Sequence, residues 1–505
     1  MRSRAFSLSM ELNEAITPPT IYDTKASNKF RCSAAQCYAA FATNLLKYSY
    51  GSFLGFTTIL LAKLYPQIDN DNAKMKISFG EITWFGSTCF MIPVGSLLVG
   101  LLAQNIGSRL TLLVSSIAFA TSWTIFYYAT NSTMLLGAQA IAGLFVASAL
   151  GPGATYVVEI SQTHLRSILM ASTNLSAMIG VFFTVLLNNF FHWRTIVLIN
   201  LAFPIAGFLA VCTIPESPHW LASKGRLEEA ESSLLWLRGW KKSGHNDATP
   251  EFISLKETYA NSADKANVPL VAAATTSKSH FKNIIASYCH RSFYLPLLSI
   301  SYMFVVHSCT GYSALHAFCI IIFDTIEAPI ESSVAASIFD AMRILGAVVC
   351  LLSIHCAGKR RLMIISLLGG GFSYTTITTL LLLRQRDVIS DGLRWLAAFA
   401  MIFSGFITSA GIDKIVFMLN AELFPTAYRN VGAGIGIFVH SVCSAIANKL
   451  FLYVFHAITL PGVFFIFAVS CFVCCATFYF IFPETEGRTL KEIEEHYGGT
   501  SRLAR

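Results

Sequence analysis

The chain alternates between long apolar stretches and shorter polar ones. Apolar stretches of about 20 residues recur, each long enough to cross roughly 30 Å of hydrocarbon as a helix. The pattern predicts six spans, a polar stretch, and six more spans. The predicted spans are 36–61, 82–102, 110–129, 134–158, 168–188, 195–214, 293–323, 334–355, 362–383, 395–420, 431–453 and 461–482.

These spans predict five parts of the chain. The parts are a cytoplasmic N-terminal tail at 1–34, an N-terminal six-helix bundle at 35–214, a cytoplasmic loop with short helices at 215–292, a C-terminal six-helix bundle at 293–482 and a cytoplasmic C-terminal tail at 483–505. In the loop, 227–237 has apolar residues at helical spacing and is followed by Gly239. Thr489 and Glu492 fit a capping box that opens a last helix.

Composition and charge place the chain in a lipid bilayer. Of its 505 residues, 54% are hydrophobic and 13% are charged, which excludes an ordinary soluble enzyme. Lys and Arg are concentrated in the segments expected inside, so both termini are predicted to be cytoplasmic. The net charge of +8 therefore reports topology and attraction to anionic lipids. Because no basic stripe is interleaved with aromatic residues, nucleic acid is not an expected partner.

The cysteines and the short sequence motifs indicate little covalent chemistry. Most of the 13 cysteines fall inside predicted spans, where they behave as small apolar residues. No spacing typical of a metal site or of an ATP-binding loop is present, so we expect no cofactor, no metal and no enzymatic activity. A glycosylation sequon begins at Asn131, in a short loop expected outside.

The sequence contains an internal repeat. After the fourth span, Glu159 precedes Arg166 by seven residues, and after the tenth span Glu422 precedes Arg429 by seven residues. Gly107-Ser108-Arg109 is echoed by Gly358-Lys359-Arg360, and a Pro-Glu pair follows both the sixth and the last span. Matching positions in two halves indicate a parallel repeat of one bundle.

The two Pro-Glu segments read PESPHWL from Pro215 and PETEGRT from Pro483. They resemble the paired PESPRWL and PETKGRT signatures of the sugar porter family, within the major facilitator superfamily. The resemblance implies an all-α membrane protein with 12 transmembrane helices in two pseudo-symmetric six-helix bundles. The segments 82–87, 122–123, 237–240 and 358–360 are most similar to insect facilitated trehalose and hexose transporters.

The resemblance also implies a set of gating residues on the cytoplasmic side. In the family, such acids and arginines tie the two halves together when the outer side is open, and ion pairs of about 1 kcal/mol suit a reversible gate. The matching residues here are Glu159, Arg166, Glu422, Arg429, Arg109, Lys359 and Arg360. The alternative is that they only anchor helix ends at the lipid boundary.

Several charges usual at this gate are replaced in the chain. The positions are Gln104, Asn105, Gln139, His355 and Cys356. Fewer ionic links predict that the inner side opens at a lower cost in free energy.

Sugar recognition requires many directional hydrogen bonds and an aromatic face inside an apolar wall. By ungapped counting, the resemblance places substrate contacts at Asn174, His307, Ser308, Ser313, Phe417 and His440. These residues depart from the family's usual amides and tryptophan. Each of them is also compatible with a packed core position.

Charged residues enter the eighth and tenth spans. Asp413 and Lys414 stand where the family carries prolines, and a central charge costs about 2.5–3.5 kcal/mol on insertion. Because adjacent residues do not share a helical face, we expect at least one to face water or a partner such as His440. Asp340 and Arg343 are spaced to pair locally.

These observations predict a facilitative uniporter of the plasma membrane for trehalose or a hexose, for which a monomer is sufficient. Segment 51–58 carries no acid where proton-driven relatives in the family have an aspartate, which favours uncoupled transport. One alternative is a facilitator of another solute such as an organic ion, favoured by Asp413, Lys414 and the histidines. The other is a sensor that binds a nutrient without moving it.

Overall fold

The computed structural model describes residues 26–67, 77–87, 91–239, 251–253, 255–256, 291–385, 391–424 and 429–482, with single positions 484, 486, 492 and 497. In the N-terminal half the helices are α2 (Ala26–Leu64), α3 (Phe79–Gly86), α4 (Met91–Ile106), α5 (Ser108–Tyr128), α6 (Ser132–Leu150), α7 (Pro152–Ile160), α8 (Thr163–Leu187) and α9 (Trp193–Thr213), with a short 3-10 turn, η1 (Tyr65–Gln67), after α2.

A pair of short helices follows, and then the C-terminal half. The pair is α10 (Pro218–Ser223) and α11 (Leu227–Leu237). The C-terminal half comprises α15 (Arg291–Cys309), α16 (Tyr312–Ala317), α17 (Cys319–Ile326), α18 (Ser332–Ala357), α19 (Lys359–Arg384), α20 (Asp391–Ser409), α21 (Ile412–Glu422) and α22 (Arg429–Ile481).

Taken over the described ranges, these helices build the predicted fold of 12 membrane crossings, which confirms the fold class. The difference from the sequence prediction is that several crossings are broken. The second is α3 with α4, the fourth α6 with α7, the seventh α15 to α17, and the tenth α20 with α21. The last two crossings run together in α22, where Thr459 leaves helical geometry at φ 62° and ψ 169°.

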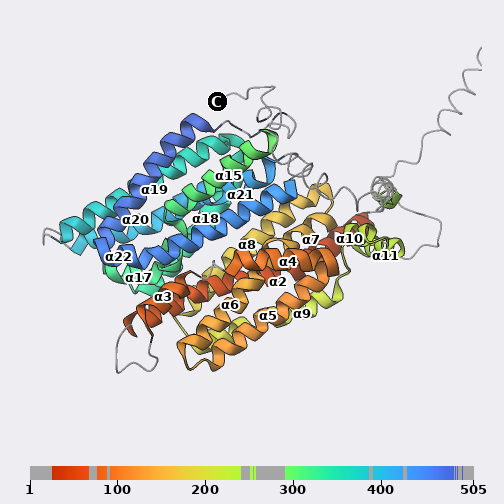
Figure 1. The fold of residues 1–505 in the computed structure, drawn as a ribbon, viewed down its shortest axis with the longest axis horizontal. Helices are drawn as coiled ribbons and strands as arrows, with labels where there is room; N and C mark the ends of the chain where they lie inside the picture. The colour runs from red at the N-terminus through yellow and green to blue at the C-terminus, as the bar shows by residue number, and fades with distance from the viewer. Residues whose placement is uncertain are drawn as a thin grey trace, which may run out of the picture.

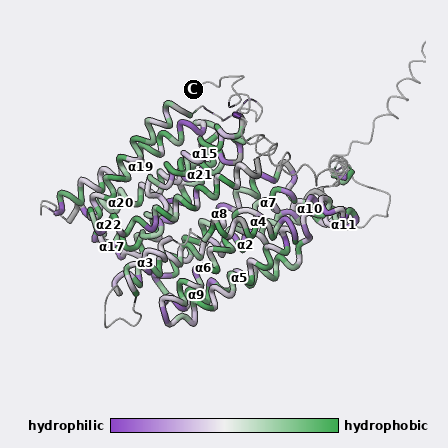
Figure 2. The backbone as a smooth tube through the Cα atoms, viewed as in Figure 1, coloured by the Kyte–Doolittle hydropathy of each residue, from purple (hydrophilic) through white to green (hydrophobic). Residues whose placement is uncertain are grey.

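The crossings pack as two groups that lie side by side (Figure 1). In the N-terminal half α2 packs on α8 and α9, and α5 packs on α6 and α9. In the C-terminal half α15 and α19 pack on α22, and α18 packs on α20. Figure 2 shows hydrophobic residues along the length of both groups, and hydrophilic residues near α10 and α11.

The inner ends of the two halves repeat the same turn. Gly107 (φ 94°) precedes α5 and Gly358 (φ 79°) precedes α19, and positive φ favours glycine because it lacks Cβ. The Glu216 carboxylate accepts from the backbone N–H of Arg109 at 3.0 Å, just as the Glu484 carboxylate accepts from that of Arg360 at 3.0 Å. Each Pro-Glu signature thus caps the helix whose N–H groups have no intrahelical partner.

The arginine of each turn is held in the same way. Arg109 Nη2 donates to the Cys212 carbonyl at 2.6 Å, and Arg360 Nη2 donates to the Tyr479 carbonyl at 2.6 Å. The repeat predicted from the sequence therefore exists in three dimensions as matched capping and matched arginine contacts.

The two halves are joined at their outer ends. Thr58 Oγ1 on α2 donates to the His316 carbonyl on α16 at 3.2 Å, and Asn448 Nδ2 on α22 donates to the Gly86 carbonyl at 3.0 Å. Asn189 Nδ2 after α8 lies 3.1 Å from Ser337 Oγ on α18. One apolar cluster at this end contains residues of both halves, including Phe53, Phe56, Phe85, Phe318, Phe339 and Phe451.

At the inner side, the apolar clusters separate. One cluster belongs to the N-terminal half, with Leu46, Leu112, Tyr156 and Val211 among its members. Another belongs to the C-terminal half, with Phe304, Met363, Ile415 and Phe424 among its members. The two halves therefore share an apolar core at one end of the bundle and have separate apolar cores at the other.

Candidate solute-binding site

The broken crossings place helix ends in the middle of the membrane. The α6–α7 break is at Gly151, the α15–α16 break at Gly311 (φ 74°) and the α20–α21 break at Gly411. Such breaks expose backbone groups that need partners, and in membrane proteins they occur where the backbone is covered by protein or lines a cavity. The side chains beside these glycines form the candidate site.

An aromatic and imidazole cluster lies beside the C-terminal breaks. The His307 ring centroid is 5.2 Å from that of His440 and 6.1 Å from that of Phe417. Phe417 and His440 are 5.0 Å apart, and Phe304 lies 5.0 Å from His440. We call these four residues the aromatic cluster, and it unites α15, α21 and α22.

The structure brings together three of the six predicted substrate contacts, namely His307, Phe417 and His440. Ser308 is buried, and its hydroxyl donates to the Phe304 carbonyl of its own helix at 3.0 Å. Ser313 is half-buried on α16, and Asn174 is exposed on α8 in the other half. A contact of either residue with solute stays a prediction.

Asp413 forms the polar centre beside this cluster. Its Oδ2 lies 2.6 Å from Lys414 Nζ and accepts a hydrogen bond from the Tyr312 hydroxyl at 2.8 Å. Its Oδ1 lies 3.5 Å from His307 Nε2. The expectation that at least one of the two residues faces water or a partner is confirmed, although the partners of Asp413 are Tyr312 and His307 and not the suggested His440. The expectation that Asp413 and Lys414 could not cover each other was wrong. The helix restarts at Gly411, so both stand in a first turn, where the lysine chain can fold back.

A second charged pair extends this centre. Arg343 Nη1 donates to Asp340 Oδ1 at 2.9 Å, which is the predicted local pairing on α18. Arg343 Nη2 also donates to the Tyr312 hydroxyl, and His316 Nε2 is 3.8 Å from Asp340 Oδ1. Tyr312 therefore links the two pairs, and sequence reasoning did not single it out. The available signal was a tyrosine directly after the glycine that breaks the seventh crossing.

The predicted gating residues Glu159, Lys359 and Glu422 make contacts that do not cross to the other half. The Ser217 hydroxyl donates to the Glu159 carboxylate. Lys359 Nζ lies 2.6 Å from Glu422 Oε2 and 3.0 Å from Glu486 Oε2. These contacts tie together neighbouring helix ends within each half.

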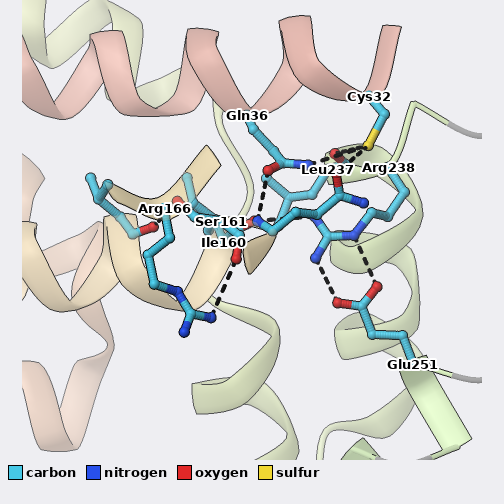
Figure 3. Close-up of polar contacts among 10 residues, drawn as sticks. Cys32, Gln36, Ile160, Ser161, Arg166, Leu237, Arg238 and Glu251 are labelled. Carbon is cyan, nitrogen blue, oxygen red and sulfur yellow. Dashed lines mark hydrogen bonds and ion pairs between the residues drawn. The ribbon is translucent and has the colours of Figure 1, made fainter. Parts of the chain in front are cut away.

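The structure describes less of the surroundings of two other gating arginines. Arg166 is exposed, with Nη2 at 3.5 Å from the Ser161 carbonyl (Figure 3). Arg429 begins α22, but its side chain lies outside the described residues, as does that of His355. Thr489 of the predicted capping box also lies outside them.

Two of the substituted gate positions have structural partners. Gln139 Nε2 donates to the Phe85 carbonyl at 2.8 Å, so this amide ties α6 to α3. The Gln104 carbonyl accepts from Trp220 Nε1 at 3.2 Å, which fastens α10 to the end of α4.

A buried arginine fastens the cytoplasmic helices to the N-terminal half (Figure 3). The side chain of Arg238 is 3% exposed, donates to the Ile160 carbonyl at 3.1 Å and makes two hydrogen bonds to Glu251. These hydrogen bonds lower the pKa of Glu251. Beside them, Gln36 Oε1 accepts from the backbone N–H of Gln162 at 2.9 Å.

Other sequence expectations concern modification and metals. Asn131 is exposed immediately before α6, and its glycosylation stays a prediction. Across the described ranges, no group of three or more His, Cys, Asp or Glu side chains is placed to hold a metal ion.

Residues 35–497 match the family described as sugar (and other) transporter. The chain belongs to this family. It is similar to the facilitated trehalose transporter Tret1 of Bombyx mori, with 24% identity over 97% of this chain and 94% of that protein. The Tret1 of Drosophila grimshawi is 26% identical over 90% of this chain, which spans 48% of that longer protein.

Solved structures carry the same fold. The inward-open xylose transporter XylE from E. coli superposes with a TM-score of 0.70 at 15% identity, covering 90% of this chain and 98% of that one. Its partially occluded inward-open form gives 0.67 over 90% and 100% of the two chains, also at 15% identity. The resemblance to sugar porters seen in the sequence is thereby confirmed.

Proposed function

We propose that this member of the sugar transporter family is a facilitative uniporter of the cell membrane that carries trehalose or a hexose by alternating access. The observation that carries the proposal is the shared outer core above two separate inner cores, with polar side chains between these levels. A central site that opens to one side at a time moves solute without covalent chemistry.

The aromatic cluster supplies much of what a sugar needs. Phe417 offers an exposed aromatic face, and the imidazoles of His307 and His440 donate or accept according to tautomer. Asn174 would add an amide from the N-terminal half, with Ser308 and Ser313 as further hydroxyls. Residues 35–214 and 293–482 would then be the two rocking bundles.

The gating residues would change partners during the cycle. In the state closed outside, Glu159 and Glu422 are held by Ser217 and Lys359 of their own halves. When the outer side opens, the inner ends approach, and Arg166 and Arg429 become available as partners across the gap. Exposed ion pairs of about 1 kcal/mol are strong enough to bias this equilibrium and weak enough to break.

Uncoupled transport is supported by the first crossing. The stretch 51–58 of α2 carries no acid that would hold a proton. The nearby Lys47 donates to the Ala149 carbonyl at 2.9 Å, which gives it a structural partner.

The test is uptake by the full chain in liposomes. Labelled trehalose and glucose are each offered with and without imposed pH and voltage gradients, and the recovered solute is analysed for chemical change. We expect saturable uptake of at least one unchanged sugar that stops at equal concentrations and does not respond to either gradient. Uptake that rises steeply with a proton gradient would contradict uniport, and saturable binding without uptake would identify a sensor.

A second candidate is a facilitator of organic ions. The buried charges of Asp340, Arg343, Asp413 and Lys414 favour it, because charges inside a membrane are expensive and mark functional sites. A panel of small organic cations and anions in the same liposomes tests it. Uptake of an ion in the absence of sugar uptake would replace the first proposal.

A further inference from the structure

Resting on the proposed function, we propose that Lys414 is a solute-contacting hydrogen-bond donor that makes the site prefer uncharged polyhydroxylated solutes to sugar acids. A set of hydrogen-bonded side chains holds this lysine in place, and we call it the charged network. The charged network consists of Asp413, Tyr312, Arg343 and Asp340.

The exposure pattern of α21 places Lys414 beside the aromatic cluster. Most of this helix is buried against α15, α19, α20 and α22 of its own half. Lys414 (26% exposed side chain) and Phe417 (38% exposed) are three residues apart, so they lie on one face of the helix. Because the Phe417 ring also touches His307 and His440, this exposed face borders the candidate solute site.

Lys414 retains donor capacity for a solute. A lysine ammonium has three N–H donors, and Asp413 Oδ2 at 2.6 Å takes one of them. The remaining donors match hydroxyl oxygens. The Lys414 side chain is 26% exposed, against 6% for Asp413, 10% for Arg343 and 5% for Asp340, which makes the lysine the accessible end of the charged network.

The charged network holds the lysine because its hydrogen bonds connect two helix breaks. Tyr312 is the first residue of α16, after Gly311, and its hydroxyl donates to Asp413 in the first turn of α21 at 2.8 Å. Arg343 donates both to this hydroxyl and to Asp340 on α18. Three crossings therefore fix the Asp413 carboxylate, and the carboxylate fixes the ammonium.

Charge balance decides which solutes suit this arrangement. Lys414 and the charged network together contain two carboxylates and two cations, so a neutral polyol leaves this balance unchanged. A sugar acid that binds Lys414 brings a second carboxylate beside Asp413. The Asp413 carboxylate is almost fully buried, so a second negative charge beside it is repelled more strongly than in water, and the sugar acid is disfavoured.

The first experiment removes the donor. In liposomes, Lys414→Met is expected to raise the KM for the transported sugar about tenfold or more, because a hydrogen bond from a charged donor to the solute is lost. Lys414→Arg keeps a charged donor and is expected to retain most of the affinity. Lys224→Met, on the exposed cytoplasmic end of α10, controls for the loss of a lysine. A KM that stays within about twofold in Lys414→Met would overturn the proposal.

The second experiment measures a gain in the uptake of a sugar acid, which a misfolded variant would not show. Asp413→Asn leaves Lys414 uncompensated, so we expect uptake of glucuronate relative to glucose to rise about tenfold. The neutral pair Asp413→Asn/Lys414→Met is expected to return the ratio toward that of the native chain. A ratio unaltered in Asp413→Asn would overturn the selectivity mechanism.

The experiments distinguish a failure of the proposed function from a failure of the inference on Lys414. Native protein that takes up neither trehalose nor glucose would overturn the proposed function and this inference with it. Native protein that takes up sugar, with unaltered KM in Lys414→Met, would overturn this inference alone.

Discussion

The two halves of the molecule agree at their inner ends and differ at their centres. At the inner ends, Glu216 and Glu484 cap equivalent helices in equivalent ways. At the centre, the N-terminal half carries one buried cation, Lys47, bonded to a backbone carbonyl near the Gly151 break. The C-terminal half instead places four charged side chains beside the Gly311 and Gly411 breaks.

This difference distinguishes the residues that stabilise the fold from those that can recognise a solute. The shared caps serve any bundle of this shape, because they satisfy helix ends at the membrane boundary. Buried charges cost free energy and add no packing advantage over apolar side chains. Their concentration in the C-terminal half, against the buried Lys47 of the N-terminal half, therefore indicates that the C-terminal half has the larger role in recognising solute.

The largest predicted effect is the loss of stability on removing one member of the charged centre. Arg343→Met leaves Asp340 as a buried charge without its partner, which costs about 3–5 kcal/mol. Lys47→Met, in the other half, removes a hydrogen bond to a carbonyl and costs about 1–3 kcal/mol. The midpoint of thermal unfolding in detergent compares them. Equal losses in the two variants would remove the distinction between the centres.

The next prediction tests the equality of the inner ends. Glu216→Gln and Glu484→Gln each weaken charge-assisted hydrogen bonds to backbone N–H groups and are expected to cost about 1.5–3 kcal/mol. Because the two sites share no partner, the double variant should lose the sum of the two. The same unfolding midpoints measure this, and one cap that proves silent would show that the halves are stabilised differently.

A smaller effect concerns the glycines under the caps. Gly107→Ala and Gly358→Ala force an alanine into positive φ, which costs about 1–2 kcal/mol, and the added Cβ presses on the capping carboxylate. Gly137→Ala, in an open position inside α6, is the control and is expected to stabilise the helix by about 0.5–1 kcal/mol. Losses no larger than in this control would argue against the shared turn.

The smallest effect is a pH dependence found in the N-terminal half. Its source is Glu251, whose pKa is lowered from 4.5 by the hydrogen bonds of Arg238. A lowered pKa in the folded state adds stability at neutral pH, and this stability is lost as the pH falls from about the ordinary value through the lowered one. The hydrogen-exchange protection factors of α10 and α11, which are corrected for the pH dependence of intrinsic exchange, should therefore fall on acidification in the native chain and change less in Glu251→Gln. Identical pH profiles would contradict the clamp.

The sequence predicted the fold well because span length and loop charge depend on local composition. It also predicted the Asp340–Arg343 pair, since residues three apart on a helix are neighbours. It missed the helix breaks, because a glycine such as Gly411 is compatible with both a helix and its end. Treating the tenth span as one helix then led to the wrong partners for Asp413.

The remaining part of the site required the three-dimensional fold. Tyr312 meets Asp413 only because the breaks of the seventh and tenth crossings lie against each other. No pattern within either segment specifies this contact. The predicted contacts at Asn174 and Ser313 rest on resemblance, and they await the binding experiments.

Alternating access around this site is tested most directly by distances measured between spin labels. One pair of labels bridges the outer ends of α2 and α16, and another bridges the inner ends of α7 and α21. We predict short outer and long inner distances without solute, and a second population with the opposite pattern when trehalose or glucose is added. Distances that ignore every transported sugar, or that lengthen and shorten together at both ends, would contradict the account.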